Sequence, residues 1–406
     1  MTRALLISDV YFPRVNGVST SIRSFRDDLA AASVETTLVV PDYPAKSAAA
    51  EPGVVRVPSA GVPRDPEDRR MRRGALRAAL ARLDGEHFDL VHVQTPFVAH
   101  YAGVRLARRR GIPVVATYHT LFEEYLHHYV PLLPRAIGRG LARAFTRSQC
   151  RQLDAIVSPS EPMRALLAGY GVRTPVQVIP TGLPADRFAP GDGARFRAAQ
   201  RIPAGRPLLL YVGRVAHEKN IDFLVHAYSE LRAARPDALL VIAGEGPARP
   251  HLQELVRGLG IERDVAFVGY LEREQALRDC YAAADVFVFA SRTETQGLVL
   301  LEAMAQGRPV VSTAHLGTAS VLQSGCGAAV VPEDRTAFAR AILDFIEDPV
   351  RAARAGAAAR RYAEGWSSAV MAQRLAAFYR DLTRRDMLGS LRLPAPSPAG
   401  DISRVA

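Results

Sequence analysis

The chain has 406 residues, of which 48% are hydrophobic, and its length favours two domains that each bury a core of their own. No apolar run approaches the ~18–20 residues of a membrane span, and the first apolar segment ends at Asp9, too early for a signal peptide, which predicts a cytoplasmic protein. The net charge of +11 indicates an anionic partner (nucleic acid, an acidic lipid surface or a phosphorylated substrate), and the three widely spaced cysteines suggest neither a disulfide framework nor a zinc site.

Short apolar runs alternate with helical patterns throughout, which predicts an α/β protein with parallel sheets and crossover helices. In the first half, the predicted strands are residues 4–7, 37–40, 54–57, 90–93, 114–117, 155–157 and 176–179. The second half repeats the scheme at residues 208–212, 239–243, 265–268, 286–290, 310–312 and 328–331. A Pro-, Gly- and Asp-rich stretch lies between the two halves. We therefore expect two Rossmann-like domains, then a helix and a disordered tail, at residues 1–184, 185–365, 366–388 and 389–406.

Asn16 and Gly17 follow the first strand and precede a helical run. An Asn-Gly pair there predicts a helix start, and the glycine allows an anionic group to approach the backbone. A plain structural turn is the alternative.

His119 ends the strand at residues 114–117, on the side where ligands of such sheets bind. A hydrogen-bonded structural histidine is the alternative. The segment that follows contains Tyr125 and His128 and is rich in aromatic residues and histidine. It predicts either the lining of an acceptor pocket or a cap on the domain.

A row of arginines recurs every four residues between positions 132 and 154, with Ile137, Leu141 and Phe145 between them. This pattern predicts a basic amphipathic helix of the kind that lies on anionic membranes, with a solvated helix face as the alternative. The row consists of Arg135, Arg139, Arg143, Arg147 and Arg151. Elsewhere in the same domain, residues 65–67 come near an Asp-x-Asp metal motif, in what we predict to be an arginine-rich loop.

The second domain opens with a strand followed by Arg214, and Lys219 stands at the next helix start. Lysine opposes the helix dipole there and gains nothing locally, so a bound diphosphate would explain both cations. Two solvated charges are the alternative.

The stretch from 292 to 311 reads as a polar loop, a helix and a strand, with Gly297 at the turn into the helix. Its exposed N–H groups suit a phosphate. Glu294 and Glu302 flank these donors, and because carboxylates repel phosphate, we expect both to accept hydrogen bonds from sugar or ribose hydroxyls. A surface loop glutamate and a solvated helix glutamate are the alternative.

Together these motifs resemble the retaining glycosyltransferases of family four, which have the GT-B fold. The spacing of Glu294 and Glu302 and the run between them are the most specific match, and the resemblance extends to about residue 385. Asn16 to Val18, Gly213 to Lys219 and the crossover at 180–182 match as well, although residues 180–184 lack the Asn and Asp usual there. The resemblance implies two Rossmann-like domains facing across a cleft, with the C-terminal helix crossing back to the first domain.

By this resemblance, Arg214, Lys219, Glu294 and His119 are the catalytic residues. The two cations would bind the donor diphosphate, Glu294 the sugar, and His119 would lie beside the anomeric centre. Further donor contacts would come from the loop at Asn16 and Gly17, from backbone N–H groups in the helix start, from the ribose-binding Glu302, and from backbone that meets the base. The helix-start and base-binding residues are Gln296, Gly297, Leu298, Val299, Tyr270 and Leu271.

Residues 118–129 and 293–297 are most similar to bacterial enzymes that glucosylate diacylglycerol, and less so to lipid-linked mannosyltransferases. We therefore expect a peripheral enzyme on the inner face of the cytoplasmic membrane that moves a hexose, in the first instance glucose from UDP-glucose, to a lipid hydroxyl. It would need neither metal nor cofactor and bind no nucleic acid. A mannosyltransferase using GDP-mannose, a nucleotide-sugar epimerase and a non-catalytic sugar- or nucleic-acid-binding protein are the alternatives.

Overall fold

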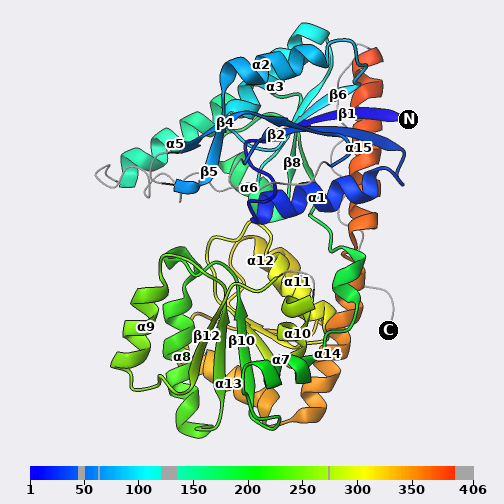
Figure 1. The fold of residues 1–406 in the computed structure, drawn as a ribbon. Coiled ribbons are helices and arrows are strands. Elements are labelled where there is room, and N and C mark those ends of the chain that lie inside the picture. The colour runs from blue at the N-terminus through cyan, green and yellow to red at the C-terminus, as the bar shows by residue number, and fades with distance from the viewer. Residues whose placement is uncertain (44–50, 63–64, 120–134, 273–274, 389–406) are drawn as a thin grey trace.

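The computed structural model describes residues 1–43, 51–62, 65–119, 135–272 and 275–388. Its first sheet has seven parallel strands in the order β3-β2-β1-β6-β7-β8-β9 (Figure 1). Each strand overlaps a predicted run, and the strands are β1 Thr2–Ile7, β2 Val34–Pro41, β3 Val54–Val57, β6 Leu90–Val93, β7 Val114–Thr117, β8 Ala155–Ser158 and β9 Val176–Val178. The predicted tail at 389–406 lies outside the described residues.

The second sheet has six parallel strands in the order β12-β11-β10-β13-β14-β15. They again fall on the predicted runs: β10 Leu208–Val212, β11 Leu239–Ala243, β12 Val265–Gly269, β13 Val286–Phe289, β14 Val310–Ser312 and β15 Ala328–Val330. In both sheets the strand order reverses beside the first strand, so each has a topological switch point where ligands of this architecture bind. Two Rossmann-like sheets are therefore confirmed.

Helices cover both faces of the first sheet. Leu76 of α2 and Leu106 of α3 belong to the core on one face, and Ile22 of α1 belongs to the core on the other. The helices of this half are α1 Gly17–Leu29, α2 Arg73–Arg82, α3 Val98–Arg110, α5 Arg135–Cys150 and α6 Glu161–Gly169. Within the described residues, no helix is both long and apolar enough to cross a bilayer.

The second sheet forms one large core with its helices. These helices are α7 Gly193–Ala199, α8 Ile221–Ala234, α9 Arg249–Gly258, α10 Gln275–Ala283, α11 Leu298–Ala305, α12 Gly317–Val321, α13 Arg335–Ile346 and α14 Pro349–Glu364. Short 3-10 turns at Ala185–Phe188 and His217–Lys219 precede α7 and α8. The chain passes from one sheet to the other between β9 and β10, an interval that contains the predicted boundary at residue 184.

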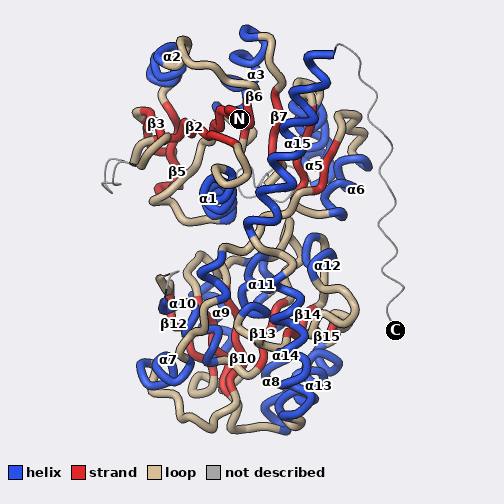
Figure 2. The backbone as a smooth tube through the Cα atoms, turned by 90° about the vertical axis from the view of Figure 1, so that its right-hand side faces the viewer, coloured by secondary structure: helices blue, strands red, loops and turns tan. Residues whose placement is uncertain are grey.

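The last helix, α15 Ser368–Leu388, crosses back to the first domain, as expected from the resemblance. Met371, Leu375 and Tyr379 are buried in the same core as α1, and Leu183 bridges to Ser367 where the chain returns. Figure 2 shows α15 running along the first domain while α14 stays with the second. The two domains are therefore joined by two chain crossings that lie side by side.

One expectation about the first domain differs from the structure. Residues predicted as an arginine-rich loop form a strand, β5 Asp65–Met71, which pairs antiparallel with β4 Ser59–Val62. The loop prediction was wrong because this segment is almost entirely polar and therefore lacks the alternation of apolar and polar residues that marks a strand. The basic helix predicted within 132–154 is present as α5 Arg135–Cys150.

Candidate active site

The loops that follow β10 and β13 bring two predicted site residues together. Lys219 Nζ lies 2.7 Å from Glu294 Oε1, and both side chains are mostly buried. Asn220, next to Lys219, donates to the carbonyl of Ala290 at 3.2 Å, which fixes one loop on the end of the other. An ammonium has three donors, so Lys219 can hold the carboxylate and still contact an anion.

Arg214 lies in the same loop as Lys219 but is more open. Its side chain is 52% exposed, and Nη1 lies 3.9 Å from Glu218 Oε1. The backbone of this loop is fixed to the domain core, because the buried Tyr211 donates a hydrogen bond from its hydroxyl to the Arg214 carbonyl at 3.1 Å. The guanidinium can therefore reach a ligand while its backbone stays fixed. The alternative that these cations are merely solvated therefore fits Arg214 better than it fits Lys219.

A glycine loop after β11, which the sequence reasoning missed, packs directly on the Arg214 loop. A Cβ atom on Gly244 would lie 1.9 Å from the Gly213 carbonyl oxygen, and one on Gly246 would lie 2.3 Å from that of Val215. Val215 N also donates to Glu245 O at 2.9 Å. Only glycine permits this approach, and the two glycines directly after a predicted strand were the available signal.

Helix α11 starts as predicted, with Gly297 at a φ of 88° before its first turn. No side chain caps this start, so its backbone N–H groups remain available at the positive end of the helix dipole. Glu294 lies three residues before Gly297, and Leu298 and Val299 form the first turn. Cations, carboxylate and helix N-terminus therefore meet at the carboxyl ends of β10 and β13.

The side chain of Gln296 binds the first domain. Its Oε1 accepts from Thr181 N at 2.8 Å, and its Nε2 donates to Thr181 O at 2.7 Å. Beside it, Ser160 Oγ donates to Thr295 O at 2.7 Å. The loop before α11 is thus tied to loops after β8 and β9, and the carboxyl ends of the two sheets face each other.

Glu302 lies on the second turn of α11 and is only 4% exposed. The buried Tyr281 of α10 donates its hydroxyl to Glu302 Oε2 at 2.9 Å, which fixes the carboxylate. A solvated helix glutamate, the alternative for this residue, is therefore wrong. After β12, Tyr270 is 57% exposed, whereas Leu271 packs against the second-domain core, so Leu271 offers a base its backbone only.

In the first domain, Asn16 and Gly17 form the predicted helix start. Asn16 Oδ1 accepts from Ser19 N at 2.9 Å and caps α1, so this oxygen serves the helix. A Cβ atom on Gly17 would meet nothing within 4 Å, which leaves the backbone open to an incoming group.

His119 is held by a buried amide after β6: its Nε2 lies 3.0 Å from Gln94 Oε1. Burial lowers the His119 pKa to about 4, so the ring is neutral at physiological pH. Because the Gln94 oxygen only accepts, Nε2 carries the proton and Nδ1 is an acceptor. His119 can therefore hydrogen-bond a sugar hydroxyl, but it supplies no positive charge to a phosphate.

Asp9, at the end of β1, is a second residue whose role the sequence reasoning missed. It accepts from Thr95 Oγ1 at 2.8 Å and from Ala99 N at 3.1 Å, and thereby caps α3. Burial raises the Asp9 pKa to about 6. An acidic residue directly after an apolar strand was the signal in the sequence.

The basic helix α5 packs one side on the first domain, burying Ala142 and Thr146, while Leu141 is 55% exposed. Arg143 lies over the Tyr170 ring at 5.1 Å, and Arg139 and Arg147 are exposed. Of the predicted apolar stripe, Leu141 is therefore exposed and Phe145 is half-buried. Tyr125 and His128 lie outside the described residues. Attachment to a membrane stays a prediction.

Comparison with known proteins supports the fold and identifies the family. Residues 15–187 match the family model described as Glycosyltransferase Family 4, and residues 192–362 match Glycosyl transferases group 1. Alpha-monoglucosyldiacylglycerol synthase of Streptococcus pneumoniae is 33% identical over 314 residues, covering 76% of this chain and 70% of the relative. A GDP-mannose-dependent alpha-(1-6)-phosphatidylinositol monomannoside mannosyltransferase of Mycolicibacterium smegmatis is 32% identical over 393 residues, covering 92% and 97%.

Among solved structures, sucrose-phosphate synthase of Thermosynechococcus elongatus superposes with a TM-score of 0.77 at 25% identity, covering 95% of this chain and all of that one. HepE of Anabaena, crystallised with UDP-glucose, gives a TM-score of 0.72 at 16% identity and covers 94% of this chain and 100% of its own. At this identity the similarity supports the fold alone. The chain therefore belongs to glycosyltransferase family four and is a hexosyltransferase with the GT-B fold.

Proposed function

We propose that the protein is a retaining, metal-independent enzyme that transfers glucose from UDP-glucose to a hydroxyl of a membrane lipid such as diacylglycerol. The Lys219–Glu294 pair beside the uncapped start of α11 carries this assignment. A cation and a helix N-terminus suit a diphosphate, and a carboxylate next to them suits sugar hydroxyls. Nucleotide and sugar would thus be bound at one point of the second domain.

In this reaction the bond between the anomeric carbon and the diphosphate breaks, and negative charge grows on the leaving group. Lys219, Arg214 and the N–H groups of α11 would stabilise that charge. The acceptor hydroxyl attacks from the same face, and the leaving diphosphate takes its proton. His119, which is neutral, would orient a sugar hydroxyl through Nδ1. Trapping a glycosyl-enzyme adduct on any carboxylate would contradict this mechanism.

The lipid acceptor is supported by the pneumococcal relative, whose name states a glucosyldiacylglycerol product, and by the basic residues exposed on α5. A peripheral location at the inner face of the cytoplasmic membrane follows from such an acceptor. The mycobacterial relative, which matches more of the chain, favours GDP-mannose and a mannolipid as a second candidate.

A thermal-shift screen of UDP, GDP, UDP-glucose and GDP-mannose, followed by a transfer assay on dispersed diacylglycerol, tests these assignments. Stabilisation by UDP and UDP-glucose, with product formed only when lipid is present, is the expected result. Stabilisation by the GDP compounds alone would favour the mannosyltransferase. Conversion of the donor without an acceptor would identify an epimerase.

A further inference from the structure

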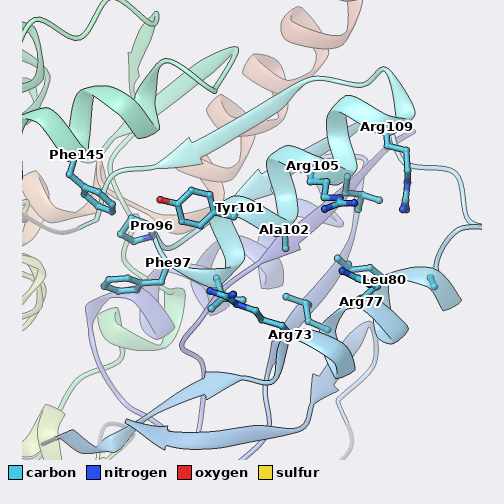
Figure 3. A pocket seen from close by; sticks show the side chains of 14 residues that line it. Arg73, Arg77, Leu80, Pro96, Phe97, Tyr101, Ala102, Arg105, Arg109 and Phe145 are labelled. Atoms are coloured by element: carbon cyan, nitrogen blue, oxygen red, sulfur yellow. The ribbon is translucent and has the colours of Figure 1, made fainter. Parts of the chain in front are cut away.

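A cavity in the first domain is separate from the Lys219–Glu294 pair, which belongs to the second domain. A cavity of 660 Å³ lies between α2, α3 and α5 (Figure 3). Its volume falls within the roughly 300–1,000 Å³ of small-molecule sites. Neither the donor nor the catalytic residues named above account for it.

The floor of this cavity is apolar. Leu76 and Leu80 of α2 and Ala102 and Leu106 of α3 line it along the facing sides of the two helices. At one end, aromatic side chains gather below α5, and two of them, Phe97 and Tyr101, are each more than half exposed. Figure 3 shows these rings with Pro96 and Phe145 at the end opposite Arg105 and Arg109. Exposed aromatic area beside an apolar floor suits a hydrocarbon chain.

The rim of the cavity is basic. Arg73 and Arg77 project from α2, and Arg105 and Arg109 project from α3. Arg109 pairs with Asp84 at 2.8 Å. Within the described residues, the other three form no hydrogen bond or ion pair, although all three are exposed. Three uncompensated guanidinium groups around one hollow create a positive potential that attracts an anion, and their planar donors suit phosphate.

One end of the cavity is formed by the loop after β6 that also holds His119. Its aromatic end begins at Pro96 and Phe97, two and three residues after Gln94, which bonds His119. From Tyr101 to Arg109 the lining of α3 advances by eight residue steps, or about 12 Å of helix at 1.5 Å per residue. A ligand in this cavity would therefore run from the neighbourhood of His119 toward the arginines at the far end of α3.

We propose that this cavity binds a phosphate-bearing lipid, with one acyl chain on the apolar floor and the phosphate among Arg73, Arg77 and Arg105. A sugar phosphate would leave the floor uncovered, and a neutral lipid would leave the arginines uncompensated. The site is separate from the donor site and does not depend on which lipid accepts the sugar.

Titration of the full chain with dihexanoyl phosphatidic acid, below its micelle concentration, tests the proposal by isothermal titration calorimetry. Wild-type protein should bind one molecule, and the double variant Arg77→Ala/Arg105→Ala should bind it about tenfold or more weakly, because it loses two charge-assisted contacts. The matched control is Arg82→Ala/Arg108→Ala, which removes exposed arginines of the same helices that do not line the cavity. An equal loss in the control would show a general charge effect and overturn the proposal.

The apolar half is tested separately with Phe97→Ser, a change on a half-exposed side chain that the fold should tolerate. This variant should bind phosphatidic acid more weakly than wild type does. Its affinity for inorganic phosphate, the second probe, should be unchanged. If inorganic phosphate binds wild type as tightly as the lipid does, the cavity does not bind an acyl chain and the proposal fails. UDP affinity should be unchanged in every variant. Lack of glucosyl transfer would count against the proposed function only, because the lipid titration involves no donor.

Discussion

Lys219 and Glu294 form a mostly buried pair in which each residue has a different expected ligand. Removing one partner leaves the other charge poorly compensated, so a loss of activity alone cannot assign their roles. The two residues must instead be separated by what each variant still binds.

For Lys219→Met we expect UDP affinity to fall about tenfold or more, because a cation facing the diphosphate is lost. For Glu294→Gln we expect UDP affinity to stay within about twofold while transfer falls by roughly a hundredfold, because the carboxylate faces the sugar. Calorimetry with UDP and a transfer assay give the two readouts. Asp237→Asn, which removes a surface partner of Arg235, is the control. Equal loss of UDP affinity in both variants would refute the assignment.

Tyr281 is a positioning residue for Glu302, since its hydroxyl holds one carboxylate oxygen. Tyr281→Phe removes a hydrogen bond worth about 1 kcal/mol, so we expect UDP affinity to fall about fivefold. Tyr228→Phe is the matched control, because this buried tyrosine of the same domain donates to the Ala238 carbonyl at 2.9 Å, away from the nucleotide. Both variants should lose similar stability, but only Tyr281→Phe should lose UDP affinity. Identical UDP affinities would show that Tyr281 is purely structural.

At the scale of elements, the start of α11 has two functions in one loop. Its backbone N–H groups are left uncapped by any side chain, whereas the Gln296 side chain bonds both backbone groups of Thr181 in the other domain. This division couples the position of the first domain to the helix that we expect to bind phosphate.

Gln296→Ala separates the two functions, because alanine keeps the backbone N–H and loses both bonds to Thr181. We expect UDP affinity to be unchanged and kcat/KM for transfer to fall by roughly 10- to 100-fold, since two hydrogen bonds of about 1 kcal/mol each hold the domains together. Gln306→Ala is the control: this buried glutamine bonds the backbone of residues 187–191 and does not contact the first sheet. A drop in UDP affinity equal to the drop in kcat/KM would contradict the interdomain role.

For the whole molecule, buried titratable groups set the pH dependence of stability. Burial lowers the pKa of His92 to about 3 and those of His100 and His119 to about 4. The unfolded chain protonates these rings near pH 6.5, so it binds more protons than the folded chain as pH falls below that value, and stability is lost. Asp9 acts in the opposite direction, because its raised folded pKa of about 6 stabilises the fold on acidification.

Three histidines outweigh one aspartate. At pH 5 each ring disfavours the folded state by roughly 2 kcal/mol, against about 1.4 kcal/mol gained from Asp9. We therefore expect the apparent Tm from calorimetry to fall between pH 7 and pH 5. His100→Gln should make this fall smaller, because one such ring is removed. A Tm that does not change between pH 7 and pH 5 would contradict the predicted loss of stability on acidification. An unchanged pH dependence in His100→Gln would contradict the role of this histidine.

The sequence alone determined both sheets and the position of the signature helix. Buried strands such as β7 and β10 are continuous apolar runs, and α11 begins at a glycine, so local pattern and burial agree there. The family resemblance supplied the expected roles of Glu294 and Lys219, and the structure places these residues together. The resemblance could not supply the hydrogen-bond partners that come from distant segments, such as Tyr281 for Glu302 or Gln94 for His119.

Only the tertiary structure decided how Gln296, Asp9 and the arginines of α2 and α3 are used. Each depends on a contact between segments far apart in the chain, and a single sequence records no distance between them. The β4–β5 hairpin was missed for a related reason, since its polar residues carry no alternation with apolar ones. Local hydrophobic period fixes strands and helices, whereas the chemistry of a side chain depends on what the fold packs against it.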